Sequence, residues 1–281
     1  MQTKKLINCK GKLISVEKPV VMGILNITPD SFFDGGKFNS IDSALFQTEK
    51  MLSDGATFID IGGHSTRPGA NEVELNVELN RTIPVIENIL KKFPDAIISI
   101  DTFRSKVADE AIAAGAAIIN DVSAGDADEQ MFETVVKYNA PYILMHKNGT
   151  FKTMQQKPTY NDVVLDIIDY FTPKINFLRS KGVSDLILDP GFGFGKTWEH
   201  NFELLNRLEG FKVFELPLLI GVSRKKMIQQ TTNTDASSSL NGTTATHMIA
   251  LMKGANILRV HDVKEAVECV NIYNQLKPFN S

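Results

Sequence analysis

Most of the short apolar runs in this sequence end in a side chain that can bind or activate a ligand. The side chains concerned are those of Asn26, Asp60, Asp101, Asn120, Asp121, His146, Asp189, Ser223, Arg224, Lys225, Arg259 and His261. A single carboxylate after a single strand has an ordinary explanation, because it can cap a helix N-terminus. Repetition of the pattern along the whole chain instead predicts that these side chains converge on one site.

The residue types indicate a ligand with two chemically different ends. Asp101, Asn120 and Asp189 offer hydrogen-bond acceptors, which suit the several N–H donors of an aminopyrimidine. A basic set suits phosphate or diphosphate oxygens, and it comprises Arg67, Arg224, Lys225, Arg259 and His261. We therefore expect a donor-rich heterocycle at one end of the ligand and an anion at the other.

Glycine-rich stretches follow three of the predicted strands, where the backbone can approach a ligand closely. They are Asp34–Gly36, Ile61–Gly69 and Asp189–Lys196. The last is not a P-loop, since Pro190 stands where that motif needs a glycine. GVSRK is not a nucleophile elbow, since Lys225 replaces its second glycine. The histidines lack zinc-binding spacing, so no zinc site is predicted.

An alternation of strand and helix patterns must position these residues. Runs rich in Val and Ile predict strands at Val20–Asn26, Phe58–Gly62, Ala96–Asp101, Ile118–Asp121, Tyr142–His146, Leu186–Asp189, Leu218–Val222 and Ile257–His261. Helical apolar spacing predicts helices at Ser43–Ser53, Val73–Lys92, Ser105–Ala114, Glu129–Tyr138, Val163–Lys181, His200–Glu209, Thr243–Lys253 and Lys264–Gln275. The runs AIISI and LLIGV show no in/out alternation, as expected of parallel strands buried on both faces.

Eight strand–helix pairs predict a TIM (β/α)₈ barrel of the α/β class, whose strand C-termini form the active-site mouth. An open, doubly wound sheet is the alternative. Residues 1–19 are predicted to form an N-terminal segment with a short β-hairpin around Lys10–Lys12, lying across the bottom of the barrel. Residues 20–281 form the barrel itself, so that 1–281 is one domain. The polar stretch Gln229–Ser239 is predicted to be a loop.

The composition excludes several classes of partner. The net charge of −3 gives no global field to attract nucleic acid or an anionic membrane. No apolar run approaches the ~20 residues that span a bilayer, and the first residues lack a signal-peptide core. Cys9 and Cys269 are too few for a disulfide framework. We therefore expect reduced thiols, a cytoplasmic location and small-molecule substrates, with no nucleic-acid or membrane partner.

Eight stretches in this order resemble the dihydropteroate synthase family. They are GILNITPDSFFDGG, IDIGGHSTRPG, SIDTFRSKVA, IINDVSAG, LMH, LDPGFGFGK, GVSRKKMI and LRVHD, and they span about Val20 to Asp262. The resemblance implies condensation of (7,8-dihydropterin-6-yl)methyl diphosphate with 4-aminobenzoate, giving 7,8-dihydropteroate and diphosphate, with Mg²⁺ as cofactor. It also implies a homodimer, and a pocket in which sulfonamide drugs imitate the aminobenzoate.

The resemblance implies roles for individual positions. Asn26 is implied as the Mg²⁺ ligand, and the implied catalytic residues are Asn26, Asp34, Lys225, Arg259 and His261. The implied substrate-binding residues are Thr66, Arg67, Asp101, Asn120, Asp189, Phe194, Ser223, Lys225, Arg259, Val260 and His261. Within this set, the implied pterin ligands are Asp101, Asn120, Asp189 and Lys225. The implied diphosphate ligands are Arg259 and His261. The sequence departs from the family pattern in two places: His64 replaces the usual glutamate, and Lys147–Gly149 differs from the usual sequence of that loop.

The expected route is an SN1-like displacement, because the electron-rich dihydropterin ring can delocalise a cationic methylene. Asp34 would offset that charge, and no protein nucleophile is needed. Three other functions stay open at this point: a methyltetrahydrofolate–corrinoid methyltransferase, a sugar-phosphate aldolase with Lys225 as Schiff base, and a non-catalytic pterin-binding protein. Release of diphosphate upon addition of aminobenzoate distinguishes the synthase from all three.

Overall fold

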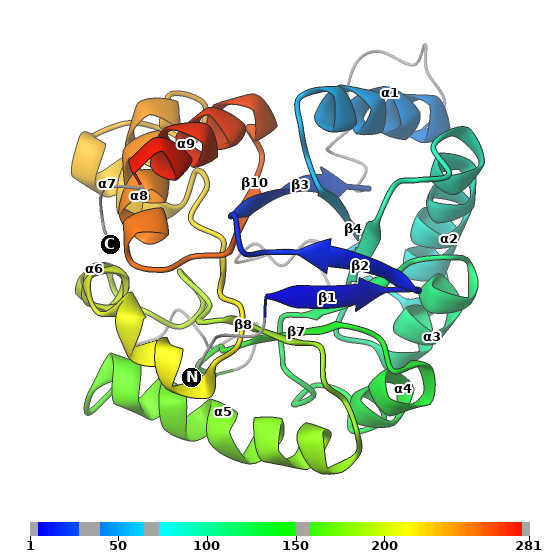
Figure 1. Cartoon of the computed structure of the whole chain (residues 1–281), viewed down its shortest axis with the longest axis horizontal. Helices are drawn as coiled ribbons and strands as arrows, with labels where there is room; N and C mark the ends of the chain where they lie inside the picture. Colours follow the sequence, from blue (N-terminus) through cyan, green and yellow to red (C-terminus); the bar gives the residue numbers. More distant parts are fainter. Residues whose placement is uncertain (1–4, 28–39, 65–72, 150–157, 277–281) are drawn as a thin grey trace.

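The predicted strands form one parallel eight-stranded sheet that curls into a nearly closed barrel (Figure 1). These strands are β3 (Val20–Asn26), β4 (Phe58–Gly62), β5 (Ile98–Asp101), β6 (Ile118–Asp121), β7 (Tyr142–Met145), β8 (Leu186–Asp189), β9 (Leu219–Ile220) and β10 (Ile257–Val260). The computed structural model describes residues 5–27, 40–64, 73–149 and 158–276. The predicted TIM barrel of the α/β class is confirmed.

The barrel closes between β8 and β9, the first and last strands in the order β8-β7-β6-β5-β4-β3-β10-β9. Leu188 and Leu218 form an isolated parallel bridge, and the Leu188 N–H donates to the Pro217 carbonyl at 2.9 Å. These contacts join the two strands that an open sheet would leave as free edges. β9 is shorter than the predicted Leu218–Val222, because Leu218 meets the sheet only through that bridge.

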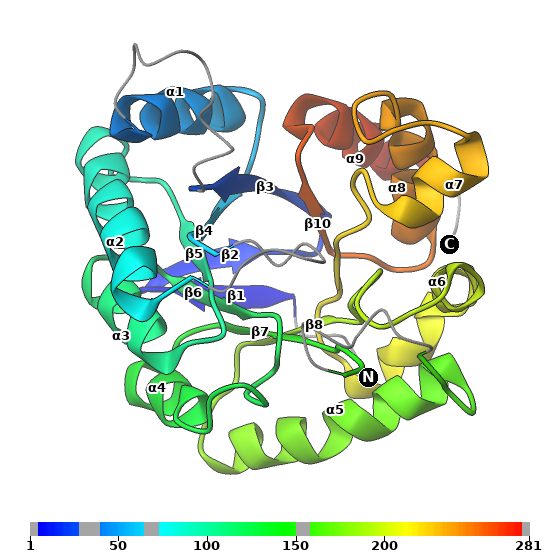
Figure 2. The ribbon, with the colours of Figure 1, turned by 180° about the vertical axis from the view of Figure 1, so that it is seen from behind.

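Helices surround the barrel (Figures 1 and 2). They are α1 (Ser40–Ser53), α2 (Leu75–Lys92), α3 (Ser105–Ala113), α4 (Met131–Tyr138), α5 (Val163–Ser180), α6 (Trp198–Asn206), α7 (Lys226–Thr232), α8 (Leu240–Met252), α9 (Val263–Leu276) and the 3₁₀ helix η2 (Leu208–Phe214). Local capping sets some boundaries; the Asp162 carboxylate, for example, accepts from the Val164 and Leu165 N–H groups and starts α5. No helix in the described residues is both long and apolar enough to cross a membrane.

One predicted helix and one predicted loop need correction. The predicted helix His200–Glu209 is divided, since α6 stops at Asn206 and the chain continues as η2. The predicted loop Gln229–Ser239 begins inside α7, which has only two buried apolar residues, Met227 and Ile228, as its anchor. Such a short apolar pair gives too little periodicity to be recognised as a helix.

The N-terminal hairpin closes the bottom of the barrel, as predicted. β1 (Leu6–Cys9) pairs antiparallel with β2 (Lys12–Ser15), and Lys10 and Gly11 form the turn with φ of 52° and 88°. Ile7, Cys9 and Val16 pack against the inner ends of the barrel strands. In Figure 1 the hairpin crosses the end of the barrel that faces the viewer.

In every barrel strand except β5, alternate residues belong to two separate apolar clusters. The inner cluster, together with the hairpin, includes Met22, Phe58, Ile118, Ile143, Ile187, Leu219 and Ile257. Their strand neighbours, such as Ile59, Ile119, Leu188 and Leu258, pack outward against the helices. Because side chains alternate across a strand, the residue two places after each inner apolar residue also faces the barrel interior. This second inner layer is where the site lies.

Candidate active site

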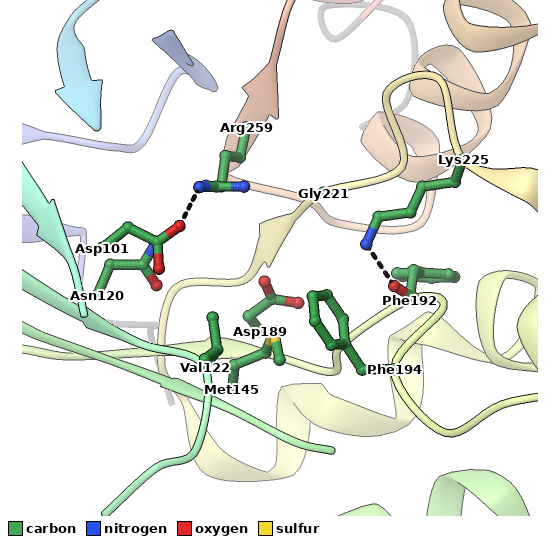
Figure 3. A pocket seen from close by; sticks show the side chains of 10 residues that line it. All are labelled: Asp101, Asn120, Val122, Met145, Asp189, Phe192, Phe194, Gly221, Lys225 and Arg259. Carbon is green, nitrogen blue, oxygen red and sulfur yellow. Dashed lines mark hydrogen bonds and ion pairs between the residues drawn. The ribbon is translucent and has the colours of Figure 1, made fainter. Parts of the chain in front are cut away.

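A pocket occupies the second inner layer, toward the carboxyl ends of the strands (Figure 3). It holds about 350 Å³ of space, part of it open to solvent. The lining residues are Asp101, Asn120, Val122, Met145, Asp189, Phe192, Phe194, Gly221, Lys225 and Arg259. Six of the predicted site residues therefore meet in one pocket, namely Asp101, Asn120, Asp189, Phe194, Lys225 and Arg259.

Strand periodicity explains how these polar residues come together. Asn120, Asp189 and Arg259 each stand two positions after an inner apolar residue, Ile118, Ile187 and Ile257 respectively. A side chain two positions along a strand points to the same face, about one layer nearer the carboxyl end. The apolar layer thus supports a polar layer directly above it.

An ion-pair network centred on Arg259 links the acidic side of the pocket. The Arg259 guanidinium donates from Nε to Asp60 Oδ2 at 2.7 Å and from Nη2 to Asp101 Oδ2 at 2.6 Å. Asn120 Nδ2 donates to the same Asp60 oxygen at 3.0 Å. Burial lowers the pKa of Arg259, but the two carboxylates outweigh burial and raise it. Arg259 is therefore a permanent cation.

Asp60 supports the pocket without lining it. Its side chain is completely buried, and it accepts hydrogen bonds from both Asn120 and Arg259. The sequence alone favours neither a structural nor a functional role for Asp60. The contacts favour a structural role, in which Asp60 fixes two of the lining residues.

Burial makes the ionised form of the pocket carboxylates unfavourable. It raises the pKa of Asp101 to about 7, against the opposing influence of the Arg259 cation. Burial also raises the pKa of Asp189, although the Gly191 N–H donates to its Oδ1 at 2.8 Å. A ligand that brings N–H donors to these oxygens stabilises their ionised form.

Lys225 faces the pocket from the side opposite Asp101 and Asn120 (Figure 3). Its Nζ donates to the Phe192 carbonyl at 2.7 Å and lies 4.2 Å from the centre of the Phe194 ring. Burial lowers the pKa of Lys225 to about 8. The preceding Arg224 has φ of 55° and forms a bidentate ion pair with Asp262, at 2.5 and 2.9 Å. The turn at Arg224 thus separates the two basic side chains and leaves Lys225 as the inward one.

Three other predicted residues lie beside the pocket rather than in its lining. Ser223 Oγ is 3.2 Å from His261 Nδ1, and the exposed His261 side chain faces a polar groove between α1 and α9. Val260 is completely buried next to Arg259. The predicted residues Asp34, Thr66 and Arg67 lie outside the described residues.

Asn26 ends β3 next to the acidic side of the pocket. A Cβ atom placed on Gly62 would lie 3.6 Å from both Asn26 Oδ1 and Asp101 Oδ2, so these two oxygens flank the same glycine. Within the described ranges, no group of three or more His, Cys, Asp and Glu side chains is arranged to hold a metal ion.

Sequence reasoning missed one buried cation close to the pocket. Lys196 is only 5% exposed, and its Nζ lies 2.9 Å from the Gly191 carbonyl and 3.0 Å from His146 Nδ1. Burial lowers the pKa of Lys196 to about 7. The sequence offered a signal, since Lys196 ends the GFGFGK stretch, but the failed P-loop match gave that lysine no role.

The family model and the similar proteins agree on one enzyme family. A family described as pterin binding enzyme matches residues 22–261. The chain is 46% identical over 265 residues to dihydropteroate synthase of Escherichia coli K12, covering 94% of this chain and 93% of that protein. It is 42% identical over 264 residues to the Bacillus subtilis dihydropteroate synthase, covering 93% and 90%.

Solved structures with the same fold include ligand complexes of dihydropteroate synthases. The Yersinia pestis dihydropteroate synthase in complex with a sulfonamide drug is 44% identical, with a TM-score of 0.91 over 97% of this chain and 99% of that one. The Xanthomonas albilineans enzyme in complex with 7,8-dihydropteroate is 34% identical, with a TM-score of 0.88 over 97% and 98%.

We predict that Asp60→Ala destabilises the protein by about 3–5 kcal/mol, because it leaves Arg259 and Asn120 in a buried site without their shared acceptor. Urea unfolding measures the effect. The control is Lys50→Ala, which breaks an exposed ion pair with Asp54 and is expected to cost less than about 1 kcal/mol. Equal costs for the two variants would contradict the structural role of Asp60.

Proposed function

The chain belongs to the dihydropteroate synthases of the pterin-binding enzyme family, and we propose that the pocket at the carboxyl end of its barrel is their active site in this protein. Dihydropteroate synthase is a transferase of folate biosynthesis. It condenses (7,8-dihydropterin-6-yl)methyl diphosphate with 4-aminobenzoate and releases diphosphate. The observation that carries the assignment of the site is the meeting of six predicted residues in one pocket.

The acidic side of the pocket is assigned to the pterin ring. Asp101, Asn120 and Asp189 present oxygens that match the N–H donors of an aminopyrimidine edge. The raised pKa values of the two carboxylates support this assignment, because bound donors would relieve the cost of ionising them. Lys225 contacts the ring from the opposite side.

The basic groups are assigned to the departing diphosphate. Arg259 already neutralises Asp60 and Asp101 through Nε and Nη2, while Nη1 has no hydrogen bond to a described residue. That nitrogen is placed to donate to a leaving-group oxygen as negative charge develops there. We retain His261 as a second diphosphate ligand, which requires its side chain to turn from Ser223 toward the pocket.

The chemical step is an SN1-like displacement. The pterin methylene loses diphosphate as its C–O bond breaks, and the ring delocalises the resulting cation. The aminobenzoate nitrogen then forms the C–N bond and loses one proton to solvent. Ionised Asp101 and Asp189 beside the ring stabilise that positive charge electrostatically. No protein nucleophile is needed. Asp34, Thr66 and Arg67 are assigned to charge stabilisation and substrate binding, and Phe194 with Ser223 to the aminobenzoate pocket.

Asn26 is assigned as the protein ligand of Mg²⁺. Its amide oxygen has no hydrogen bond to a described residue and lies across Gly62 from the Asp101 carboxylate, which suits a hard cation. Mg²⁺ keeps several waters and commonly binds substrate phosphates, so one amide oxygen is an adequate protein ligand. When bound, Mg²⁺ neutralises charge on the diphosphate.

We expect the purified protein to form dihydropteroate and release diphosphate only when both substrates are present. Asp101→Ala and Lys225→Ala should each lower kcat/KM by roughly 10²-fold or more, since each removes a charged contact to the reacting ring. Lys226→Ala is the matched control, because Lys226 is the adjacent but exposed lysine. Near-normal turnover in either pocket variant would refute the assigned site, and absence of diphosphate release by the wild type would refute the function.

We expect chelation of divalent cations to lower turnover, and added Mg²⁺ to restore it. Asn26→Ala should raise the Mg²⁺ concentration for half-maximal rate by roughly 10–100-fold, the range seen when a group supporting a metal site is removed. A Mg²⁺ titration of both proteins measures this. An unchanged titration curve would remove Asn26 as the ligand.

We propose a cytoplasmic homodimer. Cys9 and Cys269 are free and buried, which fits a reducing compartment. Ile249 and Met252, one turn apart on α8, are 44% and 65% exposed and give that helix an apolar outer face. The late helices α7, α8 and α9 lie together on one side of the barrel (Figure 1).

Met252→Glu is expected to convert the dimer to a monomer of 31.1 kDa, because it places a charge in the apolar interface. Sedimentation equilibrium gives the mass. Phe46→Glu is the control, since Phe46 is 65% exposed on α1 instead. A monomeric wild type, or a dimer that survives Met252→Glu, would contradict an interface on α8.

A further inference from the structure

The segment of residues 190–196, here the 190–196 loop, controls the position of Lys225. The Phe192 carbonyl accepts the hydrogen bond from Lys225 Nζ at 2.7 Å, and the Phe194 ring lies 4.2 Å from the same nitrogen. Both contacts hold the ammonium at the edge of the pocket (Figure 3). Any change in the path of this loop therefore moves Lys225.

The 190–196 loop folds around the ammonium of its own last residue. Lys196 Nζ donates to the Gly191 carbonyl at 2.9 Å and to the Phe194 carbonyl at 3.3 Å, and it lies 3.0 Å from His146 Nδ1. In its charged form Lys196 has three N–H donors and no acceptor. The two carbonyls use two of these donors, and His146 Nδ1 accepts the third in the tautomer that carries its proton on Nε2. Lys196 is not among the residues that line the pocket.

Close packing makes the loop dependent on this internal cation. Gly191 and Gly195 have φ of 72° and 64°, and a Cβ on them would lie 1.9 Å from the His146 carbonyl oxygen and 2.3 Å from the Asn148 carbonyl oxygen. The loop is thus pressed backbone-to-backbone against residues 146–148. The Lys196 hydrogen bond to the Gly191 carbonyl is buried, and the one to the Phe194 carbonyl is partly buried. A buried carbonyl that is cut off from water needs a protein donor.

Other hydrogen bonds hold different parts of the loop. The Gly193 N–H donates to Asn201 Oδ1 at 2.7 Å, and the Tyr160 hydroxyl donates to the Gly195 carbonyl at 2.8 Å. Neither reaches the carbonyls of Gly191 and Phe194, which flank the Phe192 group that binds Lys225. The Gly191 carbonyl also accepts from the Phe194 N–H at 3.2 Å. Among the described residues, only Lys196 donates a side-chain hydrogen bond to these two carbonyls.

We propose that Lys196 is a positioning residue, whose buried ammonium fixes the 190–196 loop so that the Phe192 carbonyl and the Phe194 ring hold Lys225 against the pterin ring. The proposal rests on the proposed function, since it assigns Lys196 an effect on the same substrate. Without the ammonium, the Phe194 carbonyl and the His146 ring nitrogen lose their donor, the Gly191 carbonyl keeps only the Phe194 N–H, and the loop relaxes. Lys225 then loses its fixed position although its own side chain is intact.

A double-mutant cycle tests whether Lys196 acts through Lys225. Calorimetry measures the Kd of 7,8-dihydropteroate for the wild type, Lys196→Met, Lys225→Met and the double variant. When Lys225 is present, we expect Lys196→Met to raise the Kd about tenfold. This is the effect of losing one well-placed hydrogen bond to a charged group. In the Lys225→Met background it should weaken binding less than about twofold, because the residue through which it acts is gone.

Lys174→Met is the matched control. Lys174 is also largely buried, with 15% of its side chain exposed, and it donates to the Ala124 carbonyl at 2.9 Å and pairs with Asp126. It makes no contact with the 190–196 loop, so it should lower stability without changing Kd in either background. A similar loss of affinity in Lys174→Met would show that general destabilisation, not positioning, explains the Lys196 effect.

The outcomes separate the two hypotheses. Equal effects of Lys196→Met with and without Lys225 would overturn the positioning role, whereas failure of the wild type to make dihydropteroate would overturn the proposed function. If Lys196→Met does not fold, Lys196→Gln goes through the same cycle. It keeps two N–H donors, so it should weaken binding about threefold, again only while Lys225 is present.

Discussion

The ion pairs of Arg259 with Asp60 and Asp101 are the interaction on which the site depends. A single buried carboxylate is costly, and two near each other raise that cost through mutual repulsion. Arg259 bonds to both within 2.7 Å and so permits an acidic wall inside an otherwise apolar barrel. Because Asp60 also accepts from Asn120, one buried carboxylate sets the orientation of two lining residues.

The barrel geometry makes this arrangement predictable from the local sequence pattern. An apolar inner layer closed by the hairpin lies beneath each polar residue, and the two-residue period of a strand carries the chain from one layer to the next. This is why polar residues after apolar runs could be predicted to converge. Five of the eight strands have the predicted bounds at their C-terminal end, namely β3, β4, β5, β6 and β8, and four of these carry Asn26, Asp101, Asn120 or Asp189.

The parts that sequence could not predict depend on contacts between distant residues. Arg259 is separated from Asp60 by 199 positions and from Asp101 by 158, and no local pattern specifies that they pair. The burial of Lys196 was not predicted, because a lysine after a glycine-rich run is typical of a side chain that contacts solvent or phosphate. α7 has too few buried residues to show helical periodicity. In each case tertiary contacts supply what the local pattern lacks.

The pocket keeps its carboxylates apart from Lys225. The charged forms of these groups are less stable in the pocket than in water. Burial raises the pKa of Asp101 to about 7 and lowers that of Lys225 to about 8, so it disfavours the charged form of both groups. Direct pairing of Lys225 with Asp189 or Asp101 would remove this cost, but it would also close the pocket. The 190–196 loop prevents that pairing, since it binds the Lys225 ammonium through a carbonyl and a ring. A ligand that brings N–H donors to the carboxylates and a polarisable ring to Lys225 supplies the interactions that these groups lack. Because the groups need no rearrangement when the ligand binds, little binding free energy is lost in ordering them.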